Sequence, residues 1–308
     1  MTLRKTLVIA NPNSGAGRLG KRWDRILAQI REHYGQAFDS VLTTRQGHAT
    51  ELSRDGASAG YDLIVAVGGD GTANEVLNGF DLTAGNQDGP ALGLLPFGTG
   101  NDLAKSLGVP KEMPQAIELL RPRPPRPIDV GKITALDDSG GMVTRHFLNV
   151  ADFGSGGAIA ARANNTTKAF GARLTYIWSI LSTMATFKNP EVTFNVDGEE
   201  DRVAVANNVV VANGRHFGSG LTPAPDALMD DGVFDVVLMG DFGLVEGALN
   251  LPRLMKGTHL SHPKVRSYRG SRIAARADRR VQIEADGELV GVLPATFEIV
   301  PEALMINA

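Results

Sequence analysis

The stretch Val67-Gly68-Gly69-Asp70-Gly71-Thr72-Ala73-Asn74-Glu75 follows the apolar run 63–67 and precedes a segment whose apolar residues have helical spacing. A glycine-rich turn of this kind lets backbone N–H groups approach an anion, and the helix N-terminus adds a positive dipole. Asp70 cannot contact a phosphate directly because both are negative, but a divalent cation can lie between them. The stretch therefore predicts a strand, turn and helix that bind a metal–nucleotide complex.

The first 120 or so residues alternate short apolar runs with amphipathic segments. This alternation is typical of a doubly wound parallel α/β fold, in which ligands bind at the carboxyl ends of the strands. The predicted strands are 6–10, 38–43, 62–67 and 91–95, and the predicted helices are 20–33, 48–58, 73–80, 100–107 and 113–120.

A proline-rich run at 121–127 divides the chain, because its prolines cannot continue a helix or a central strand. We expect an α/β nucleotide domain over 1–124, a β-rich domain over 125–301, and a tail, 302–308, that can pack back on the first domain. The second domain is predicted as an antiparallel sandwich with inserted helices at 168–187 and 242–256. Its predicted strands are 128–134, 143–151, 191–197, 203–212, 233–239, 271–275, 280–285 and 295–300.

The composition narrows the class of protein. The 308 residues carry a net charge of −3 and no cysteine, which argues against nucleic-acid binding and excludes thiol catalysis and cysteine–zinc sites. Neither a targeting segment nor a run of 18 apolar residues is visible, so a cytoplasmic protein is expected, with membrane contact limited to the periphery. A homodimer is compatible with the sequence.

Two other glycine-rich loops follow predicted strands. The first is Asn11-Pro12-Asn13-Ser14-Gly15-Ala16-Gly17-Arg18, with Asn11, Ser14 and Gly15 as candidate phosphate contacts. The second is Pro96-Phe97-Gly98-Thr99-Gly100-Asn101-Asp102; taken alone, it also fits a simple helix start, with Thr99 as the cap and Asp102 in a capping box. The parallel fold predicts that all three loops lie side by side at one sheet edge.

The first of these loops has two other interpretations. Gly15, Gly17 and Gly20 match a dinucleotide-binding fingerprint, with Asp39 as the ribose acid. Against it, the first glycine lies too far beyond the strand, and Asp39 precedes the second strand. The segment from Gly15 to Lys21 also matches part of a phosphate-binding P-loop, but Arg22 replaces the hydroxyl that should hold the metal.

Taken in order, the three loops resemble those of the diacylglycerol kinase catalytic family, and are especially similar to its soluble bacterial YegS/DgkB-like branch. The resemblance covers nearly the whole chain. It implies an ATP- and Mg²⁺-dependent lipid kinase that phosphorylates the hydroxyl of diacylglycerol or a related lipid. It also implies that Thr43, Thr99, Asn101 and Asp102 join the nucleotide-binding residues, and that Asp70 takes part in catalysis through the metal.

Two later motifs are similar to signatures of the same family. By resemblance, the carboxylate of Asp231 and the carbonyls of Leu228 and Val233 hold a Mg²⁺ ion. By the same resemblance, Glu288 in Glu284-Ala285-Asp286-Gly287-Glu288 is the general base and Asp286 its neighbouring catalytic carboxylate. Read without the family, both motifs also fit simple Asp-Gly turns between strands.

The acceptor is predicted to be a lipid at a membrane surface, where segment 168–187 lines an acyl-chain cleft or rests on the bilayer. The same segment also fits a helix packed on the β-rich domain. The catalytic residues are expected to meet between the two domains. Two other functions stay open: an NAD kinase, which has a similar Gly-Gly-Asp-Gly-Thr loop, and a non-catalytic nucleotide or lipid sensor.

Overall fold

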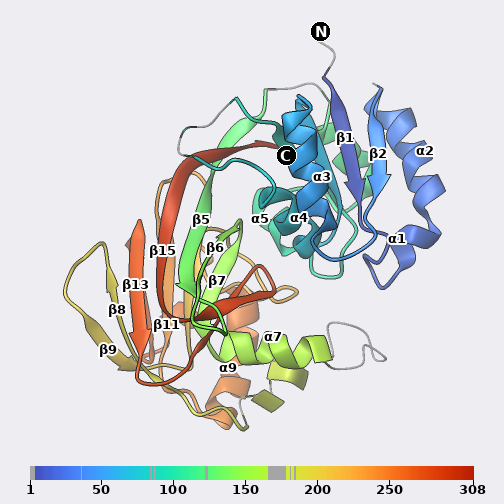
Figure 1. The fold of residues 1–308 in the computed structure, drawn as a ribbon. Coiled ribbons are helices and arrows are strands. Elements are labelled where there is room, and N and C mark those ends of the chain that lie inside the picture. Colours follow the sequence, from blue (N-terminus) through green and yellow to red (C-terminus); the bar gives the residue numbers. More distant parts are fainter. Residues whose placement is uncertain are drawn as a thin grey trace. The chain divides into compact units, whose positions relative to one another are not determined.

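The computed structural model describes residues 4–35, 37–83, 85, 88–121, 124–165, 178–180, 182–183 and 185–308. The chain forms two compact units (Figure 1). Unit 1 contains Met1–Val130 and Val300–Ala308, and unit 2 contains Gly131–Ile299. The proline-rich run at 121–127 thus lies just inside the first unit, and the C-terminal residues belong to that unit as well.

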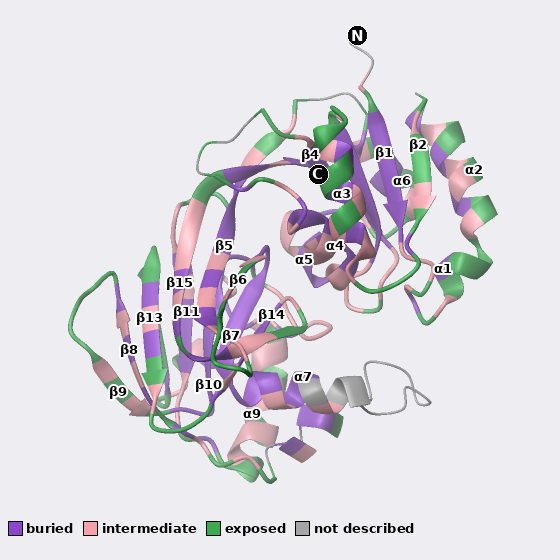
Figure 2. Cartoon of the chain, in the orientation of Figure 1, coloured by how far each residue is buried: buried purple, intermediate pink, exposed green. Residues whose placement is uncertain are grey.

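Unit 1 is built on a parallel sheet with the strand order β15-β4-β3-β1-β2. Every residue of β1, β3 and β4 is buried (Figure 2), because these strands lie inside the sheet and carry apolar side chains on both faces. The predicted doubly wound sheet is confirmed. The bounds are β1 Thr6–Ala10, β2 Asp39–Leu42, β3 Leu63–Gly68, β4 Ala91–Pro96 and β15 Glu288–Asn307, of which only the C-terminal end pairs with β4.

The helices of unit 1 follow the prediction, with differences at several of their ends. The predicted helix 20–33 is divided at Arg22 into α1 and α2. Helix α4 begins at Asp70 rather than at residue 73, because the backbone leaves its extended conformation directly after Gly69. The bounds are α1 Arg18–Lys21, α2 Trp23–Tyr34, α3 His48–Ser58, α4 Asp70–Leu77, α5 Asp102–Leu107 and α6 Met113–Leu119.

Unit 2 is the predicted sandwich, and β15 contributes to both of its layers. One layer has the order β12-β11-β10-β7-β14-β15, and the other consists of β9-β8-β13-β15 with β5 and β6 beyond β15. The strand bounds are β5 Arg126–Leu136, β6 Met142–Phe147, β7 Val150–Gly154, β8 Glu191–Val196, β9 Arg202–Val205, β10 Asn208–Ala212, β11 Phe234–Met239, β12 Val265–Gly270, β13 Arg272–Ala277 and β14 Gln282–Ala285.

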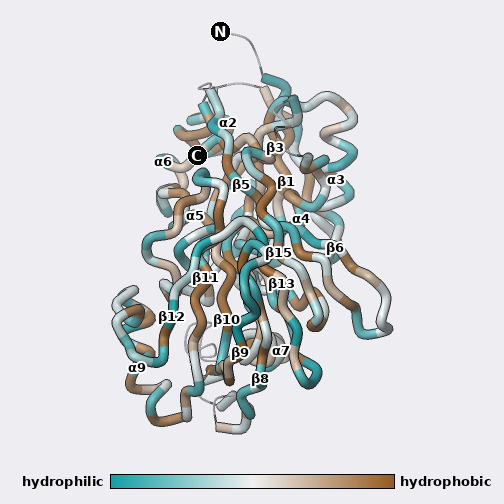
Figure 3. Tube along the Cα trace, turned by 90° about the vertical axis from the view of Figure 1, so that its left-hand side faces the viewer, coloured by the Kyte–Doolittle hydropathy of each residue, from teal (hydrophilic) through white to brown (hydrophobic). Residues whose placement is uncertain are grey.

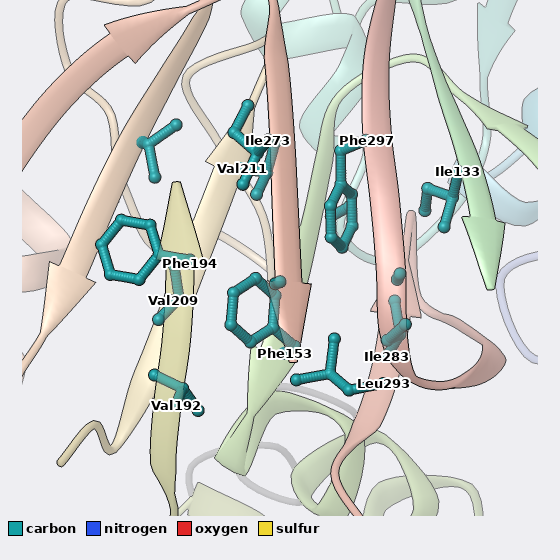
Figure 4. Packing of buried hydrophobic residues seen from close by; sticks show 14 of the residues in the cluster. Ile133, Phe153, Val192, Phe194, Val209, Val211, Ile273, Ile283, Leu293 and Phe297 are labelled. Carbon is teal, nitrogen blue, oxygen red and sulfur yellow. The ribbon is translucent and has the colours of Figure 1, made fainter. Parts of the chain in front are cut away.

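The core of unit 2 lies between these two layers (Figure 4). Phe153 stacks on Phe297 with a ring-centroid distance of 5.7 Å, and Phe194 packs edge-on against Tyr268. Alternate residues of β7 and β14 enter this core, among them Phe153 and Ile283. The residues between them must therefore point to the other face of the sheet, where a second apolar cluster lies.

Several elements of unit 2 differ from the prediction. The runs 143–151 and 203–212 are each two strands with a turn between them, and the predictions missed β12 and helix α7 (Ser155–Asn165). Helix α9 (Leu244–Lys256) confirms the predicted helix 242–256 closely, and a 3-10 turn follows at His259–Ser261. Most of the predicted helix 168–187 lies outside the described residues. Among the helices that are described, none combines the length and apolar character needed to cross a bilayer.

Candidate nucleotide and acceptor sites

The three predicted loops of unit 1 meet at the carboxyl ends of neighbouring strands. The strand register pairs Ala10 of β1 with Val67 of β3, and Gly68 of β3 with Pro96 of β4. The strands therefore end at the same level, and the loops that follow them start side by side. This arrangement confirms the prediction that the loops share one sheet edge.

Glycines allow two of these loops to touch through their backbones. A Cβ atom on Gly98 would lie 2.5 Å from the Cα of Gly69, and one on Gly69 would lie 3.1 Å from the Cα of Gly98. On the other side, a Cβ on Gly68 would lie 2.4 Å from Oγ1 of Thr72 and 3.0 Å from Oγ of Ser14. Side chains larger than hydrogen do not fit here, so the loops form a backbone-lined cradle of the kind that accepts a polyanion.

Asp70 connects two of the helices that start at this edge. Its Oδ1 accepts a hydrogen bond of 3.0 Å from the N–H of Leu103, in the first turn of α5. Helix α5 is capped by Asn101, so the alternative interpretation of Thr99 as a helix cap does not hold. Asn101 adopts φ 52°, and its Oδ1 accepts the N–H of Gly98, which forms a tight turn that leaves Thr99 exposed.

Asn11 joins the first loop to the turn after β3. Its side-chain amide donates to Oγ1 of Thr72 at 3.3 Å, and its N–H donates to the carbonyl of Val67. Thr43 is buried at the end of β2, where its N–H donates to the carbonyl of Ala10. The structure therefore gathers the predicted nucleotide-binding residues around the ends of β1 to β4.

Two of the predicted nucleotide-binding residues make contacts within helix α4. Ala73 is buried in α4, and the carbonyl and side-chain oxygens of Asn74 accept hydrogen bonds from Asn78. Asp102 is buried and forms an ion pair of 2.7 Å with Lys105. Asp39, the acid of the alternative dinucleotide interpretation, instead accepts the hydroxyl of Tyr61 at 2.6 Å.

In unit 2, the Asp-Gly turn between β14 and β15 is fixed by a carboxylate. Asp286 and Gly287 have φ values of 48° and 92°, as in a type I′ hairpin turn. The Asp286 carboxylate accepts the N–H groups of Leu148, Asn149 and Val150 at 2.8, 3.0 and 3.2 Å. These charge-assisted bonds fasten the turn to the start of β7. Glu288, the predicted base, follows as the first residue of β15 and is exposed.

A buried pair of carboxyl groups lies beside this turn, and it was not predicted from the sequence. Glu284 of β14 stands directly opposite Asp152 of β7 in the antiparallel register, so both side chains point to the same face. Burial raises the pKa of Asp152 to about 7. Burial, and then the charge of Asp152, raise the pKa of Glu284 well above its usual range. Glu284 also accepts the N–H of Gly287.

The three residues of the implied metal site are close in sequence, but the carboxylate has an ionic partner. Asp231 forms an ion pair with Arg269, and its Oδ1 accepts the N–H of Val233 at 3.3 Å. Leu228 is exposed. Within the described parts of the chain, no cluster of three or more metal-binding side chains occurs. A Mg²⁺ ion at Asp231 would therefore compete with the guanidinium of Arg269.

A largely apolar pocket with a cavity volume of about 80 Å³ opens at the other end of β7. Ser155, Asn207 and Asn208 form its polar end. His259 also lines it; this side chain is buried, and burial lowers its pKa. The apolar lining comes from α7, α9 and neighbouring segments, among them Ile159, Ile180, Phe217, Leu221, Leu251 and Leu254.

Comparisons with known proteins match the two parts of the chain separately. Residues 5–133 match the diacylglycerol kinase catalytic domain, and residues 150–308 match the YegS C-terminal NAD kinase beta sandwich-like domain. Diacylglycerol kinases from Bacillus subtilis and Staphylococcus haemolyticus are 28% and 30% identical to the chain. The first alignment covers 96% of this chain and 93% of its relative, and the second covers 94% and 84%.

Solved structures agree with these matches. A Bacillus anthracis protein assigned as a diacylglycerol kinase superposes with a TM-score of 0.79 at 27% identity, over 100% of this chain and 96% of the other. Yeast NADH kinase superposes with a TM-score of 0.51 at 14% identity, over 99% of this chain and 83% of the other. The latter likeness shows a related fold only.

Proposed function

The chain belongs to the diacylglycerol kinase catalytic-domain family of lipid kinases, and from this membership we propose that it transfers the γ-phosphoryl group of ATP to the hydroxyl of diacylglycerol or a related lipid. Unit 1 binds the nucleotide, and unit 2 binds the acceptor and supplies the base. The observation that carries the proposal is the cradle formed by Gly68, Gly69 and Gly98 at the start of α4.

The cradle suits the phosphates of ATP. Its glycines let a phosphate approach the backbone closely, and the N-terminal end of α4 directs its positive dipole toward the same place. Ser14 adds a hydroxyl group beside Gly68, and the bond between Asn11 and Thr72 fixes the adjoining loops. Since phosphoryl transfer depends mainly on positioning and on neutralising charge, a rigid cradle of donors is what the reaction needs from unit 1.

A Mg²⁺ ion bound with ATP would neutralise the phosphate charge at the cradle. Asp70 is the residue that would hold it, because its carboxylate stands at the first turn of α4. Its bond to Leu103 keeps the side chain at this edge. We assign no step to the second implied metal site, because Arg269 already pairs with Asp231.

Glu288 is the proposed general base, which accepts the proton of the lipid hydroxyl. The type I′ turn determines the position of Glu288, the first residue of β15. Asp286 holds that turn by accepting three hydrogen bonds from backbone N–H groups. We therefore assign Asp286 a positioning role in catalysis. A carboxylate is a modest base, but phosphoryl transfer demands little of it.

The apolar pocket is the proposed site for an acyl chain of the acceptor. The Asp286 carboxylate binds at Val150, the first residue of β7, and Asn208 pairs with Gly154, the last. Four residues of extended strand separate these points, about 13 Å at ~3.3 Å per residue. A lipid whose hydroxyl lies near Glu288 can therefore extend a chain toward the pocket.

Helix α9 carries the features of a membrane-facing surface. None of its residues is buried, and Val245 and Leu249 are 72% and 73% exposed although both are apolar. They lie one helical turn apart, and Arg253 and Lys256 continue the same stripe toward the helix end. Figure 3 shows the mixture of apolar and polar residues along α9. We propose that this stripe rests on an anionic bilayer while the pocket receives the lipid.

The test is a labelled-ATP assay against a panel of acceptors, with each product identified by mass. The panel contains diacylglycerol, phosphatidylglycerol, a sphingoid base, a polyprenol and NAD. We expect a phosphorylated lipid, and we expect Glu288→Gln to lose turnover while it retains ATP binding. Phosphorylation of NAD alone, or full activity of Glu288→Gln, would contradict the proposal.

A further inference from the structure

Asp152 and Glu284 form a carboxyl pair in a place where acidic side chains do not help the fold. Both side chains are buried under α7, on the face of the sheet opposite the sandwich core. Among the described residues, no lysine, arginine or histidine forms an ion pair with either of them. Two like charges at directly opposed strand positions repel strongly in such surroundings.

The repulsion is removed if the pair retains one proton. A protonated carboxyl can donate its O–H to the other carboxylate, which converts repulsion into a hydrogen bond. Neither oxygen of Asp152 has a hydrogen bond of normal geometry among the described groups, although the side chain of Asn208 lies near enough to favour its charged form. A proton on Glu284 would supply such a bond.

The surroundings favour the proton on Glu284 rather than on Asp152. Asp152 lies at the start of α7, so close that a Cβ on Gly156 would be 2.0 Å from its Oδ1, and the positive end of the helix favours its charged form. Asn208, from β10, also favours the charged form of Asp152. Asp286 is the other charge that acts on Glu284, and its negative sign favours the protonated form.

Glu284 also acts on the catalytic turn. Its Oε1 accepts the N–H of Gly287, the residue directly before Glu288. A neutral Glu284 can do both tasks at once, with one oxygen accepting from Gly287 and the other donating to Asp152. The turn is then held from two sides: the Asp286 carboxylate binds the backbone at the start of β7, and Glu284 of β14 binds the N–H of Gly287.

We propose that Glu284 and Asp152 are positioning residues that share one proton and hold the turn that presents Glu288. This inference rests on the proposed function, because it takes Glu288 as the base. It adds that the reaction depends on a neutral carboxyl group next to that base. Sequence motifs centred on Asp286, Gly287 and Glu288 do not contain this requirement.

Two substitutions of similar size separate the proposal from a structural role. Glu284→Gln retains an oxygen for Gly287 and an N–H donor for Asp152, so its kcat should stay within about threefold of the original. Glu284→Met lacks both groups, and its kcat should fall about 10- to 100-fold, as small displacements of catalytic groups do. The KM for ATP should stay the same, because unit 1 binds the nucleotide. Gln282→Met, on the same strand, is the matched control and should retain full activity.

The same variants have readouts that do not depend on catalysis. At pH 8 the protein should show the infrared band of a buried protonated carboxyl, and Glu284→Gln should lack it. Hydrogen exchange at the Gly287 amide should be faster in Glu284→Met and unchanged in Glu284→Gln. If Glu288→Gln stays active while these signals behave as stated, the assignment of the base fails but the pair stands.

Two results would overturn the inference itself. One is a Glu284→Met variant that circular dichroism shows to be folded and that retains the original kcat. The other is a Glu284→Gln variant as impaired as Glu284→Met, because that result would require a negative charge at Glu284 instead of a proton.

Discussion

The N–H of Leu103 donates to the carboxylate of Asp70 over 3.0 Å, so the first turn of α5 is tied to the first residue of α4. One carboxylate thus serves two elements that start at the same sheet edge. It fixes the spacing of the loops on either side, and it adds a negative charge next to the phosphate cradle. These two contributions can be separated by substitution.

Asp70→Asn should retain the fold and lose activity. The amide oxygen still accepts from Leu103, so the free energy of unfolding should change by less than about 1 kcal/mol. The charge that would hold Mg²⁺ is gone, so kcat should fall at least ~100-fold and not recover when Mg²⁺ is raised. Steady-state kinetics over a Mg²⁺ series test this, together with urea unfolding. Retained kcat in this variant would remove Asp70 from the metal's coordination.

Gly98→Ala should disturb the cradle. The new Cβ would lie 2.5 Å from the Cα of Gly69 and 2.7 Å from Oδ1 of Asn101, so the loops must separate. We expect a stability loss of about 1–3 kcal/mol and a higher KM for ATP. Gly243→Ala is the control, because a Cβ there meets nothing within 4 Å. Equal effects of the two substitutions on KM would show that loop contact is unimportant.

Asp286→Ala should destabilise unit 2, because three backbone N–H groups at the start of β7 lose their acceptor. The expected loss is about 2–4 kcal/mol, since bonds to a charged acceptor are stronger than neutral ones. Denaturant unfolding measures it. Asp286→Asn retains one acceptor oxygen, so its stability should lie between that of the original protein and that of Asp286→Ala. An Asn variant as unstable as the Ala variant would show that the charge of the carboxylate dominates.

Leu249→Glu should reduce activity on anionic vesicles about tenfold and leave activity on a short-chain dispersed lipid unchanged. The reason is that Leu249 lies on the proposed membrane-facing stripe and not in the pocket. Trp178→Glu should behave in the same way, since Trp178 is 64% exposed. Val203→Glu, at an exposed valine of β9, is the control. Equal losses on both substrates would remove the docking surface.

Asp152→Asn should stabilise the protein more at pH 8 than at pH 5. The pKa of Asp152 is raised to about 7 in the folded chain, so the folded chain binds this proton more tightly than the unfolded chain does. Stability therefore falls as pH rises from about 4, the unfolded pKa, toward 7. Asp152→Asn has no carboxyl group to titrate, so it should not lose this stability as the pH rises. Its unfolding temperature at pH 8 should therefore be several degrees higher than that of the original protein. A gain that is independent of pH would contradict this.

The nucleotide side of the site could be predicted because its signals are local. Gly68 to Thr72 and Gly98 carry the loop geometry in their own residue types, and parallel strands bring such loops together. The choice of helix cap was harder to predict, because both Thr99 and Asn101 can cap a helix, and the φ of 52° at Asn101 is decided by the turn with Gly98.

The acceptor side contains contacts that only the assembled sheets create. Glu284 stands between Ile283 and Ala285, and this alternation is typical of a strand with one face in water. That face is covered by α7, which begins with Ser155, Gly156 and Gly157, a start with poor helix propensity. The burial of Glu284 was therefore invisible in the sequence.

Strand β15 was underestimated for a related reason. It contains Pro294 and Pro301, and proline argues against a continuous strand. Both prolines lie where the strand changes its neighbour: it pairs with β14 up to Val292, with β13 from Ala295 to Glu298, and with β4 at Ile306 and Asn307. At such places a missing N–H costs little.

The last of these pairings bears on how the protein is made. The parallel sheet of unit 1 receives the strand beside β4 from Ile306 and Asn307, which follow unit 2 in the sequence, so that sheet can close only after all of unit 2 has been synthesised. Until then β4 presents an open edge, which is a site for pairing with other chains. The nucleotide-binding half, although it is synthesised first, is therefore completed last.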